Sequence, residues 1–205
     1  MGRPRLHDDA TVLRLTDAAE ALLAEGGVEA VSVRGVADRA GATTRAVYSV
    51  FGGKDGLVSA LYRRGCARFL AAQRAVGEAA DPFDNLMRLV REGFSAFARR
   101  DPHLYRLIFE RPLPGFAPSL QDRAALGEAL GILTARMQRV VDAGLAGGRD
   151  ARQLALAGTV AVQGCVSAEL NRTPPAVDDA VMSDLLLSLY LGWRTPPVRA
   201  GDGTR

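Results

Sequence analysis

The sequence SVRGVADRAGATTRAVYSVFGGKDGL, residues 32–57, has the pattern of two short helices joined by a tight turn and followed by the start of a third helix. A helix-turn-helix needs a small residue where its helices touch, a glycine in the turn and an apolar residue that anchors the second helix. Ala37, Gly41 and Val47 stand at these three positions. Glycine suits the turn because the chain leaves the first helix through a left-handed residue. The spacing therefore predicts a helix-turn-helix.

Hydrogen-bonding side chains gather in the N-terminal half of the second helix of this motif. In a helix-turn-helix, that half faces base edges in the major groove of DNA. Arg45 can bond a guanine through two N–H groups, and Thr44 can meet a thymine methyl group or a base edge. Tyr48 and Thr43 are suited to phosphates, and Lys54 adds a cation at the start of the next helix. The alternative is a polar helix face that meets only solvent.

A basic N-terminal arm, residues 1–7, extends the predicted DNA contacts, because the arginines of GRPR can lie along a minor groove. A terminal segment without fixed structure is the alternative for this arm. The complete set of predicted DNA-binding residues is Arg3, Arg5, Ser32, Arg34, Thr43, Thr44, Arg45, Tyr48, Ser49 and Lys54.

Over residues 10–60 the sequence resembles the DNA-binding signature of TetR-family transcriptional regulators. The matching positions are Thr43-Thr44, Tyr48, Phe51 and Lys54-Asp55-Gly56-Leu57. The family often has glycine where Arg45 stands and histidine where Val50 stands. Arg45 is therefore an added candidate for a base contact, and the phosphate contact of the histidine is missing. The resemblance implies an N-terminal helix-turn-helix and a helical C-terminal domain for ligand binding and dimerisation.

The composition is that of a globular protein, since 48% of the 205 residues are hydrophobic and 24% are charged. No apolar run is long enough and free enough of charge to span a membrane, and the N-terminus lacks the apolar core of a secretory signal. We therefore expect a cytoplasmic protein without a membrane partner. Cys66 and Cys165 are then expected to be reduced and buried, with a redox switch as the alternative. His7 and His103 are too few to indicate a metal site, so we predict no metal and no cofactor.

Net charge supports a DNA partner only weakly. The formal net charge is +3, and the first 63 residues contain eight basic and eight acidic residues. The arrangement of the charges favours DNA more than their sum does. Arg34, Arg45 and Lys54 fall in the predicted reading elements, whereas most of the acidic residues belong to the first helix or its flanks.

The chain shows helical periodicity and no strand-like alternation, so the predicted fold class is all-α. A first helix over residues 11–25 should be ended by Gly26-Gly27. Further helices are expected over residues 54–76, 83–99, 101–109, from 119 or 120 to 146, 151–171 and 177–193. The expected organisation is a flexible basic arm (1–7), a three-helix DNA-binding domain (8–57), a helical ligand-binding and dimerisation domain (58–194) and a disordered tail (195–205).

The last two predicted helices have the features of a dimer interface. One carries a stripe of small residues, and the other ends in LLLSLYLGW, residues 185–193, which is apolar nearly all round and should be buried on every side. We expect a two-fold homodimer in which these helices form a four-helix bundle, with a central helix of a monomeric bundle as the alternative. The predicted interface residues are Ala157, Ala161, Gly164, Ala168, Leu185, Leu186, Leu189, Tyr190 and Trp193.

The family resemblance also implies a small-molecule pocket within residues 65–170. Aromatic and methionine side chains with a few polar ones line pockets. They also form ordinary cores, which is the alternative for each residue. The candidate lining residues are Phe69, Met87, Phe94, Phe97, His103, Tyr105, Phe109, Met137 and Gln163.

The leading interpretation is a dimeric, ligand-responsive repressor that binds a palindromic operator and is released by a small-molecule effector, with activation as the alternative within this class. An all-helical small-molecule-binding protein or enzyme without DNA binding is the alternative from another class, and a protein–protein module is a third. The sequence contains no nucleophile–base arrangement, phosphate loop or metal-ligand spacing. Asp101 and His103 are two residues apart and would not share a helix face. We therefore predict no enzymatic activity.

Overall fold

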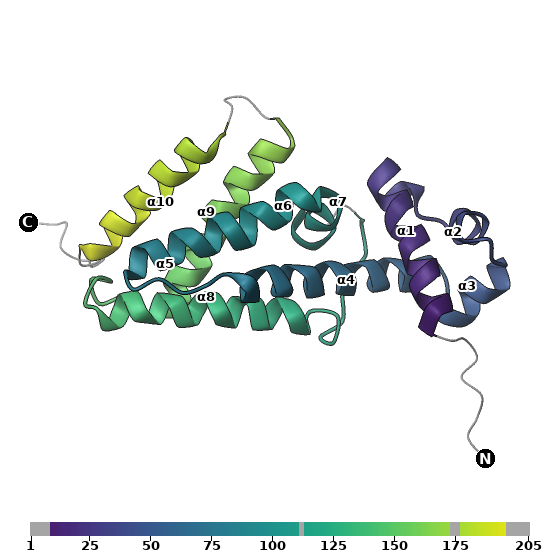
Figure 1. Ribbon diagram of the computed structural model, residues 1–205, viewed down its shortest axis with the longest axis horizontal. Coiled ribbons are helices and arrows are strands. Elements are labelled where there is room, and N and C mark those ends of the chain that lie inside the picture. Colours follow the sequence, from purple (N-terminus) through teal and green to yellow (C-terminus); the bar gives the residue numbers. More distant parts are fainter. Residues whose placement is uncertain (1–8, 111–112, 173–176, 196–205) are drawn as a thin grey trace, which may run out of the picture. The chain divides into compact units, whose positions relative to one another are not determined.

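The computed structural model describes residues 9–110, 113–172 and 177–195, which contain helices and no strand (Figure 1). The predicted all-α class is thus confirmed. The arm of residues 1–7, with Arg3 and Arg5, and the tail beyond Thr195 lie outside the described residues. None of the described helices is long and apolar enough to cross a membrane. The helices are α1 (Asp9–Ala30), α2 (Val33–Ala40), α3 (Thr44–Phe51), α4 (Lys54–Ala75), α5 (Pro82–Arg88), η1 (Leu89–Ser95), α6 (Ala96–Arg100), α7 (Pro102–Tyr105), η2 (Arg106–Glu110), α8 (Ala124–Asp142), α9 (Ala151–Leu170) and α10 (Asp179–Arg194).

The chain forms two compact units, and neither is a continuous stretch of sequence. The first unit comprises the described parts of residues 1–68 and 101–125, and the second unit comprises those of residues 69–100 and 126–205. Helix α4 therefore contributes residues to both units. The segment that begins at Asp101 belongs with the N-terminal helices.

The first unit has its core along α1. Leu15, Ala19 and Leu23 of this helix are buried, as are Val36 of α2 and Val47 of α3. Apolar residues spaced by four lie on one helix face, so α1 offers a continuous apolar stripe. Helix α1 packs against α2, and α2 packs against α3. This is the three-helix arrangement that the sequence predicts.

The regular part of α1 ends at the glycine pair that the sequence indicated. Gly26 (φ −143°, ψ 21°) and Gly27 (φ 67°, ψ −167°) are non-helical inside the element. A positive φ at Gly27 is the conformation that glycine adopts without a steric cost. Val28 and Val31 beyond the kink are buried. The bend thus returns the chain to the core before α2 begins.

The first part of α4 is enclosed within the first unit by the segment of residues 101–125. The rings of Tyr62 and Phe116 meet edge to face, with centroids 5.9 Å apart. A Cβ atom at Gly65 would lie 2.9 Å from Cδ1 of Ile108, so glycine permits close packing at this point. The fully buried residues of this part of α4 include Leu57, Val58 and Leu61.

The second unit has a core between α5, α8, α9 and α10. The rings of Phe83 and Tyr190 pack with centroids 4.4 Å apart. Buried Arg136 donates to the carbonyl oxygens of Val76, at 2.6 Å, and Asn85, at 3.1 Å. This guanidinium thereby satisfies a carbonyl that the end of α4 leaves unpaired. The buried core residues are Leu86, Met137, Val140, Ala146, Ala151, Leu154, Ala155, Tyr190 and Trp193.

The single helix expected over residues 83–99 is less regular in the structure. It is built as α5, η1 and α6 in succession, and η1 has π-helical turns over Leu89–Ser95. Gly93 lies in this part, where a Cβ atom would come within 2.8 Å of Nε2 of Gln73. The glycine therefore lets the Gln73 side chain pack directly on the helix backbone.

Helix α8 begins later than predicted, at Ala124. Ser119 and Asp122 bond each other beforehand. The Asp122 amide donates to Ser119 Oγ at 3.1 Å, and the Ser119 amide donates to Asp122 Oδ2 at 2.9 Å. These reciprocal bonds have the pattern of a capping box, which closes a first turn over residues 120–123, and the regular helix begins directly after this turn.

Candidate nucleic-acid interface

Side-chain caps and one left-handed glycine fix the turn between α2 and α3. Ser32 Oγ accepts from the amide of Gly35 at 3.1 Å, and Thr43 Oγ1 accepts from the amide of Ala46 at 3.2 Å. Each cap satisfies an N–H group that the first turn of a helix leaves unpaired. Gly41 has φ 60° and ψ 38° and bonds back to carbonyl groups of α2. The predicted caps and turn residue are thus present in the geometry that orients α3.

Helix α3 is buried on one side and exposed on the other. Val47 is fully buried and anchors the helix to the core of the first unit. Thr44, Arg45, Tyr48 and Ser49 are exposed, and Tyr48 exposes 57% of its surface. Because residues four apart share a helix face, these side chains form two adjacent stripes. The face offers hydroxyl, phenol and guanidinium donors, which suit base edges and phosphates.

Two cations near this face keep their charge unpaired within the described residues. Arg45 and Lys54 take part in none of the ion pairs found there. Arg34 lies 3.8 Å from Asp38, with side chains that are 88% and 73% exposed. An ion pair this exposed contributes little to stability. Arg34 can therefore exchange its carboxylate partner for a phosphate.

The remaining predicted DNA contacts occupy the edges of this surface. Ser32 and Thr43 are exposed, and their oxygens accept backbone N–H groups while each hydroxyl hydrogen stays available to a phosphate. Lys54 is the first residue of α4, where unpaired N–H groups favour an anion. Contact of these residues with DNA remains a prediction, and Arg3 and Arg5 lie outside the described residues.

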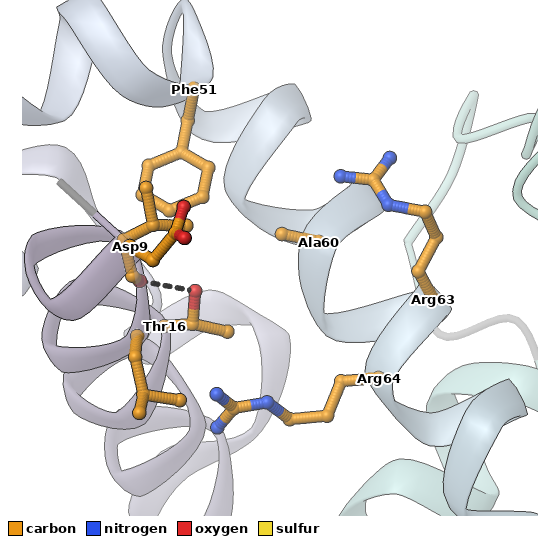
Figure 2. A pocket seen from close by; sticks show the side chains of 8 residues that line it. Asp9, Thr16, Phe51, Ala60, Arg63 and Arg64 are labelled. Carbon is orange, nitrogen blue, oxygen red and sulfur yellow. Dashed lines mark hydrogen bonds between the residues drawn. The ribbon is translucent and has the colours of Figure 1, made fainter. Parts of the chain in front are cut away.

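A shallow hollow of about 360 Å³ lies between α1 and α4 in the first unit (Figure 2). Both arginines that line it already pair with carboxylates. Arg63 lies 2.7 Å from Asp122. Arg64 lies 2.6 Å from Asp17. The positive charge in the hollow is therefore already matched by protein groups. The lining residues are Asp9, Val12, Leu13, Thr16, Phe51, Ala60, Arg63 and Arg64.

The two cysteines have the environments of structural rather than reactive thiols. Cys66 is fully buried in the first unit, and this burial raises the pKa of its thiol to about 11. Cys165 on α9 is half-buried, and burial raises the pKa of its thiol as well. The thiolate is the form that reacts. Neither environment therefore favours a redox switch.

Comparison with known families matches both ends of this architecture. Residues 15–61 match the bacterial regulatory proteins of the tetR family, and residues 87–187 match the tetracyclin repressor-like C-terminal domain. The chain belongs to the tetR family. It is accordingly a ligand-responsive transcriptional regulator, and the resemblance found in residues 10–60 is confirmed. No curated protein matches the chain significantly.

Solved structures share the tetR-family fold over most of the chain. A protein of unknown function from Rhodococcus sp. RHA1 is 22% identical, with a TM-score of 0.77 over 95% of this chain and 100% of its own. PfmR, a TetR-family transcriptional regulator from Thermus thermophilus, is 21% identical, with a TM-score of 0.65 over 85% of this chain and 97% of its own. FadR from Bacillus subtilis, solved in complex with stearoyl-CoA, is 20% identical, with a TM-score of 0.68 over 88% and 98%. At these identities the likeness shows the fold alone.

The predicted ligand-lining residues of this tetR-family member fall in both units. In the second unit, the ring of Phe69 packs against Phe94 at 5.4 Å and Phe97 at 5.3 Å between centroids. In the first unit, the rings of Tyr105 and Phe109 lie 5.0 Å apart. These side chains pack on one another, and their contact with an effector remains a prediction. The other candidates are buried Met87 and Met137 and half-buried His103 and Gln163.

The predicted dimer residues occupy both surface and core positions of the second unit. Leu186, Tyr190 and Trp193 are buried within that unit itself. Ala157 and Gly164 of α9 are exposed. Half-buried positions hold Ala161, Ala168, Leu185 and Leu189. The large apolar side chains that α9 and α10 leave exposed are Leu156, Val160, Val181, Leu187 and Leu191.

Proposed function

We propose that the chain is a repressor that binds a palindromic operator as a homodimer and is released by a small-molecule effector. The observation that carries this proposal is the exposed polar face of α3 opposite its buried anchor, Val47. A helix held in this way presents Thr44 and Arg45 to the major groove. The protein acts where the chromosome lies, in the cytoplasm, and this role requires no enzymatic step.

The apolar outer faces of α9 and α10 support the homodimer. Val160 exposes 69% of its surface, and Leu191 exposes 51%. The two helices pack against each other within the second unit. Exposed apolar side chains lie four residues apart on each helix, Leu156 and Val160 on α9 and Leu187 and Leu191 on α10, and such faces favour a protein partner. A second copy that brings the same two helices would complete a four-helix bundle with two-fold symmetry.

The two-fold symmetry of the dimer predicts the form of the operator. Two identical reading helices require two inverted half-sites, spaced roughly 34–36 Å apart or by a multiple of this distance. An effector that binds more tightly to a dimer with another spacing would shift the population away from DNA. A true effector that binds without changing operator affinity would contradict this mechanism.

DNA binding can be tested on the region upstream of the chain's own gene, with a scrambled competitor and at two salt concentrations. We expect tight binding that resists the competitor and weakens as salt rises, because phosphate contacts release counterions. Footprinting would then give the half-site spacing. Equal, weak binding to both DNAs, and no enriched sequence after selection from a random library, would refute the proposal.

Two substitutions separate base reading from phosphate binding. Arg45→Ala should relax preference at one base pair and cost about 1–3 kcal/mol of binding free energy, whereas Lys54→Ala should weaken all sequences alike and lower the salt slope by about 1. Arg123→Ala, an exposed arginine outside the reading elements, is the matched control and should change neither property. If Arg45→Ala left both affinity and sequence preference intact, the base contact would be wrongly assigned.

Long-chain acyl-CoA is the first effector class to test. The buried rings of Phe69, Phe94 and Phe97 offer an apolar environment in the second unit. FadR from Bacillus subtilis, which has the same fold, was solved with stearoyl-CoA. We expect stearoyl-CoA to lower operator affinity in a titration at fixed salt. An unchanged affinity at saturating stearoyl-CoA would exclude this class while leaving the DNA-binding proposal intact.

A further inference from the structure

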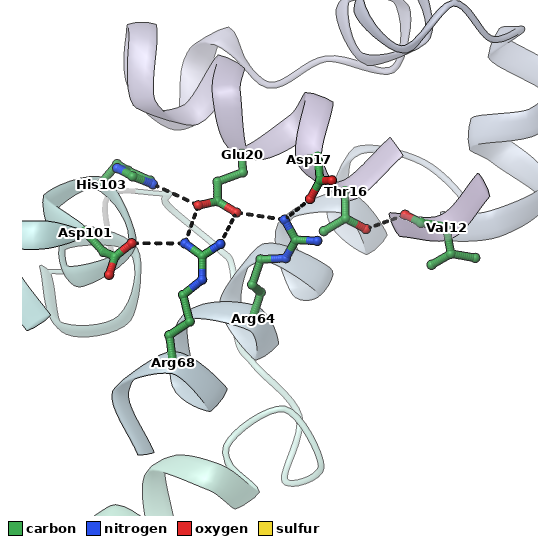
Figure 3. A network of polar contacts seen from close by, with 8 residues as sticks. All are labelled: Val12, Thr16, Asp17, Glu20, Arg64, Arg68, Asp101 and His103. Carbon is green, nitrogen blue, oxygen red and sulfur yellow. Dashed lines mark hydrogen bonds and ion pairs between the residues drawn. The ribbon is translucent and has the colours of Figure 1, made fainter. Parts of the chain in front are cut away.

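A network of charged side chains joins three segments of the first unit (Figure 3). Glu20 on α1 accepts from Arg64 at 2.8 Å and from Arg68 at 2.5 and 3.1 Å, both on α4. Arg68 also donates to Asp101 at 3.0 Å. Nε2 of His103 lies 3.5 Å from Glu20. One carboxylate of α1 thus receives several donors, and one guanidinium is shared by two carboxylates.

The two carboxylates of the network are largely buried, whereas the side chain of Arg68 between them is 40% exposed. The side chain of Glu20 is 15% exposed and that of Asp101 is 9% exposed. Charge-assisted, two-point hydrogen bonds in such surroundings are strong, and removal of one partner leaves the other charge poorly solvated. Burial alone would raise the pKa of Glu20, but the hydrogen bonds from Arg64 and Arg68 outweigh it and lower that pKa. The carboxylate is therefore firmly ionised.

The position of the network in the chain gives it a second property. Arg68 is the last residue of the first unit before the chain enters the second unit, and Asp101 is the first residue after it returns. The ion pair at 3.0 Å therefore joins the residue at which the chain first leaves the first unit to the residue at which it returns, before it leaves again after Ala125. Arg68 and Asp101 are the residues bonded directly to the two ends of segment 69–100, so a rearrangement of this segment would displace them before the rest of the first unit.

The same donors do not form a convincing metal site. Glu20, Asp101 and His103 offer ligand atoms that lie within 4.8 Å of one another. The guanidinium of Arg68, however, bonds both carboxylates and already supplies the positive charge between them. A metal ion would have to displace this partner.

We propose that Glu20, Arg68 and Asp101 form a relay that couples the second unit to the DNA-reading helices. The relay rests on the proposed function, since it explains how an effector signal would reach DNA. In the structure, Arg68 of α4 bonds Asp101 and Glu20 at the same time, and its bonds to Glu20 join α4 to α1. Displacement of Asp101 would let Arg68 move away from Glu20. The ion pairs between α1 and α4 would then rest on Arg64, and α1, against which α2 packs, would be held less firmly. Glu20 acts as a positioning residue, because its contacts run to α4 and α7 and not to the reading face, the exposed side of α3 with Thr44, Arg45, Tyr48 and Ser49.

Hydrogen exchange of the full-length protein tests the relay without an effector. In the free protein, Asp101→Asn should speed exchange of amides in residues 16–24 of α1, and Glu20→Gln should speed exchange in residues 101–110. We expect each remote increase in exchange rate to be about three- to tenfold. In each of the two regions, the exchange rate of the double variant should exceed that of the faster single variant by little, because the effects of residues in one network are not additive. Strictly local effects, or full additivity, would overturn the relay.

Asp17→Asn is the matched control. Asp17 lies on the same helix and pairs with Arg64 at 2.6 Å, yet it does not bond Arg68. Its replacement should leave exchange in residues 101–110 unchanged. If Asp17→Asn produced the same remote effect as Glu20→Gln, the effect would reflect general loosening of α1 and not the relay.

Operator DNA supplies the second arm, because coupling between two sites is reciprocal. Operator DNA should slow exchange in residues 101–110 of the unaltered protein, and Glu20→Gln should abolish this slowing while DNA stays bound. Slowing that persists in Glu20→Gln would refute the relay. Failure of any DNA to bind would instead refute the proposed function, and the exchange of the free protein would still decide whether Glu20 and Asp101 are coupled.

Discussion

Replacement of the turn glycine Gly41 by alanine tests whether backbone conformation orients α3. Gly41 has φ 60° and ψ 38°, and a Cβ atom there would meet nothing within 4 Å. Any destabilisation must therefore come from the left-handed backbone and not from a clash. That conformation costs an L-residue about 1–2 kcal/mol, and the stiffer unfolded chain of alanine returns about 0.4–1 kcal/mol. We expect a net loss of about 1 kcal/mol in the free energy of local opening, by the difference of these two terms.

Native-state hydrogen exchange measures this loss where it occurs. Amides of α2 and α3 should exchange about fivefold faster in Gly41→Ala, since about 1 kcal/mol changes an opening equilibrium by that factor. Gly41→Asn should lose less, because asparagine tolerates the left-handed region better than alanine. Operator affinity should fall in the same order, since the turn sets the direction of the recognition helix.

The matched control is Gly127→Ala in α8. A Cβ atom at Gly127 also meets nothing within 4 Å, but this glycine lies in a helix with ordinary φ. Alanine should stabilise that helix by about 0.5–1 kcal/mol. Unchanged exchange in Gly41→Ala, or a larger loss in Gly41→Asn, would show that the left-handed turn is not what holds α3.

Three further predictions follow from single sites. Gly56→Ala should disturb α3 and lower operator affinity, because its Cβ atom would overlap the carbonyl oxygen of Phe51; unchanged affinity and stability would contradict this packing. Burial would raise the pKa of Asp122, but its ion pair and its serine hydrogen bonds lower it, so its stabilising contribution is present above about pH 3.8 and lost as pH falls through the lowered value. The free energy of unfolding, measured by circular dichroism as the pH is lowered, should therefore differ between the unaltered protein and Asp122→Asn by an amount that shrinks below about pH 3.8. A difference that stayed constant with pH would contradict this role of Asp122. Iodoacetamide at pH 8 should leave Cys66 unmodified in the folded protein, because its thiol has a pKa of about 11, and rapid labelling seen by mass spectrometry would show otherwise.

The helix-turn-helix could be predicted from sequence because its determinants are local. The caps at Ser32 and Thr43 act over three residues, and the left-handed Gly41 acts on its immediate neighbours. Helical periodicity then separates buried Val47 from exposed Tyr48. Each of these interactions joins residues that lie less than two helical turns apart in the sequence, so it can be recognised from the local sequence alone.

The ion network could not be predicted in the same way. Glu20 lies 48 residues from Arg68 and 83 residues from His103. An acidic residue on an amphipathic helix ordinarily faces solvent, and nothing near Glu20 in sequence marks it as a partner of α4. The grouping of residues 101–125 with the N-terminal helices is equally non-local. Only the packed chain brings these charges together.

The last helix shows a different limit of sequence reasoning. Its end is apolar nearly all round, so periodicity does not distinguish a side that faces the protein's own core from a side that faces a partner. Tyr190 and Trp193 are buried within the second unit, whereas Leu187 and Leu191 are exposed. The exposed side of α10 therefore contains Leu187 and Leu191, which are the sequence neighbours of the predicted interface residues Leu186 and Tyr190.

Ion pairing explains how an N-terminal region with no net charge can still offer cations to DNA. Asp17 and Glu20 pair with arginines of α4, and Glu25 pairs with an arginine of α2. A paired carboxylate contributes little potential beyond the Debye length, about 8 Å at physiological ionic strength. Arg45 and Lys54 have no such partner within the described residues, so their charge is available to phosphates and bases. The balance of eight basic and eight acidic residues in the first 63 positions therefore understates the local positive charge of the reading face.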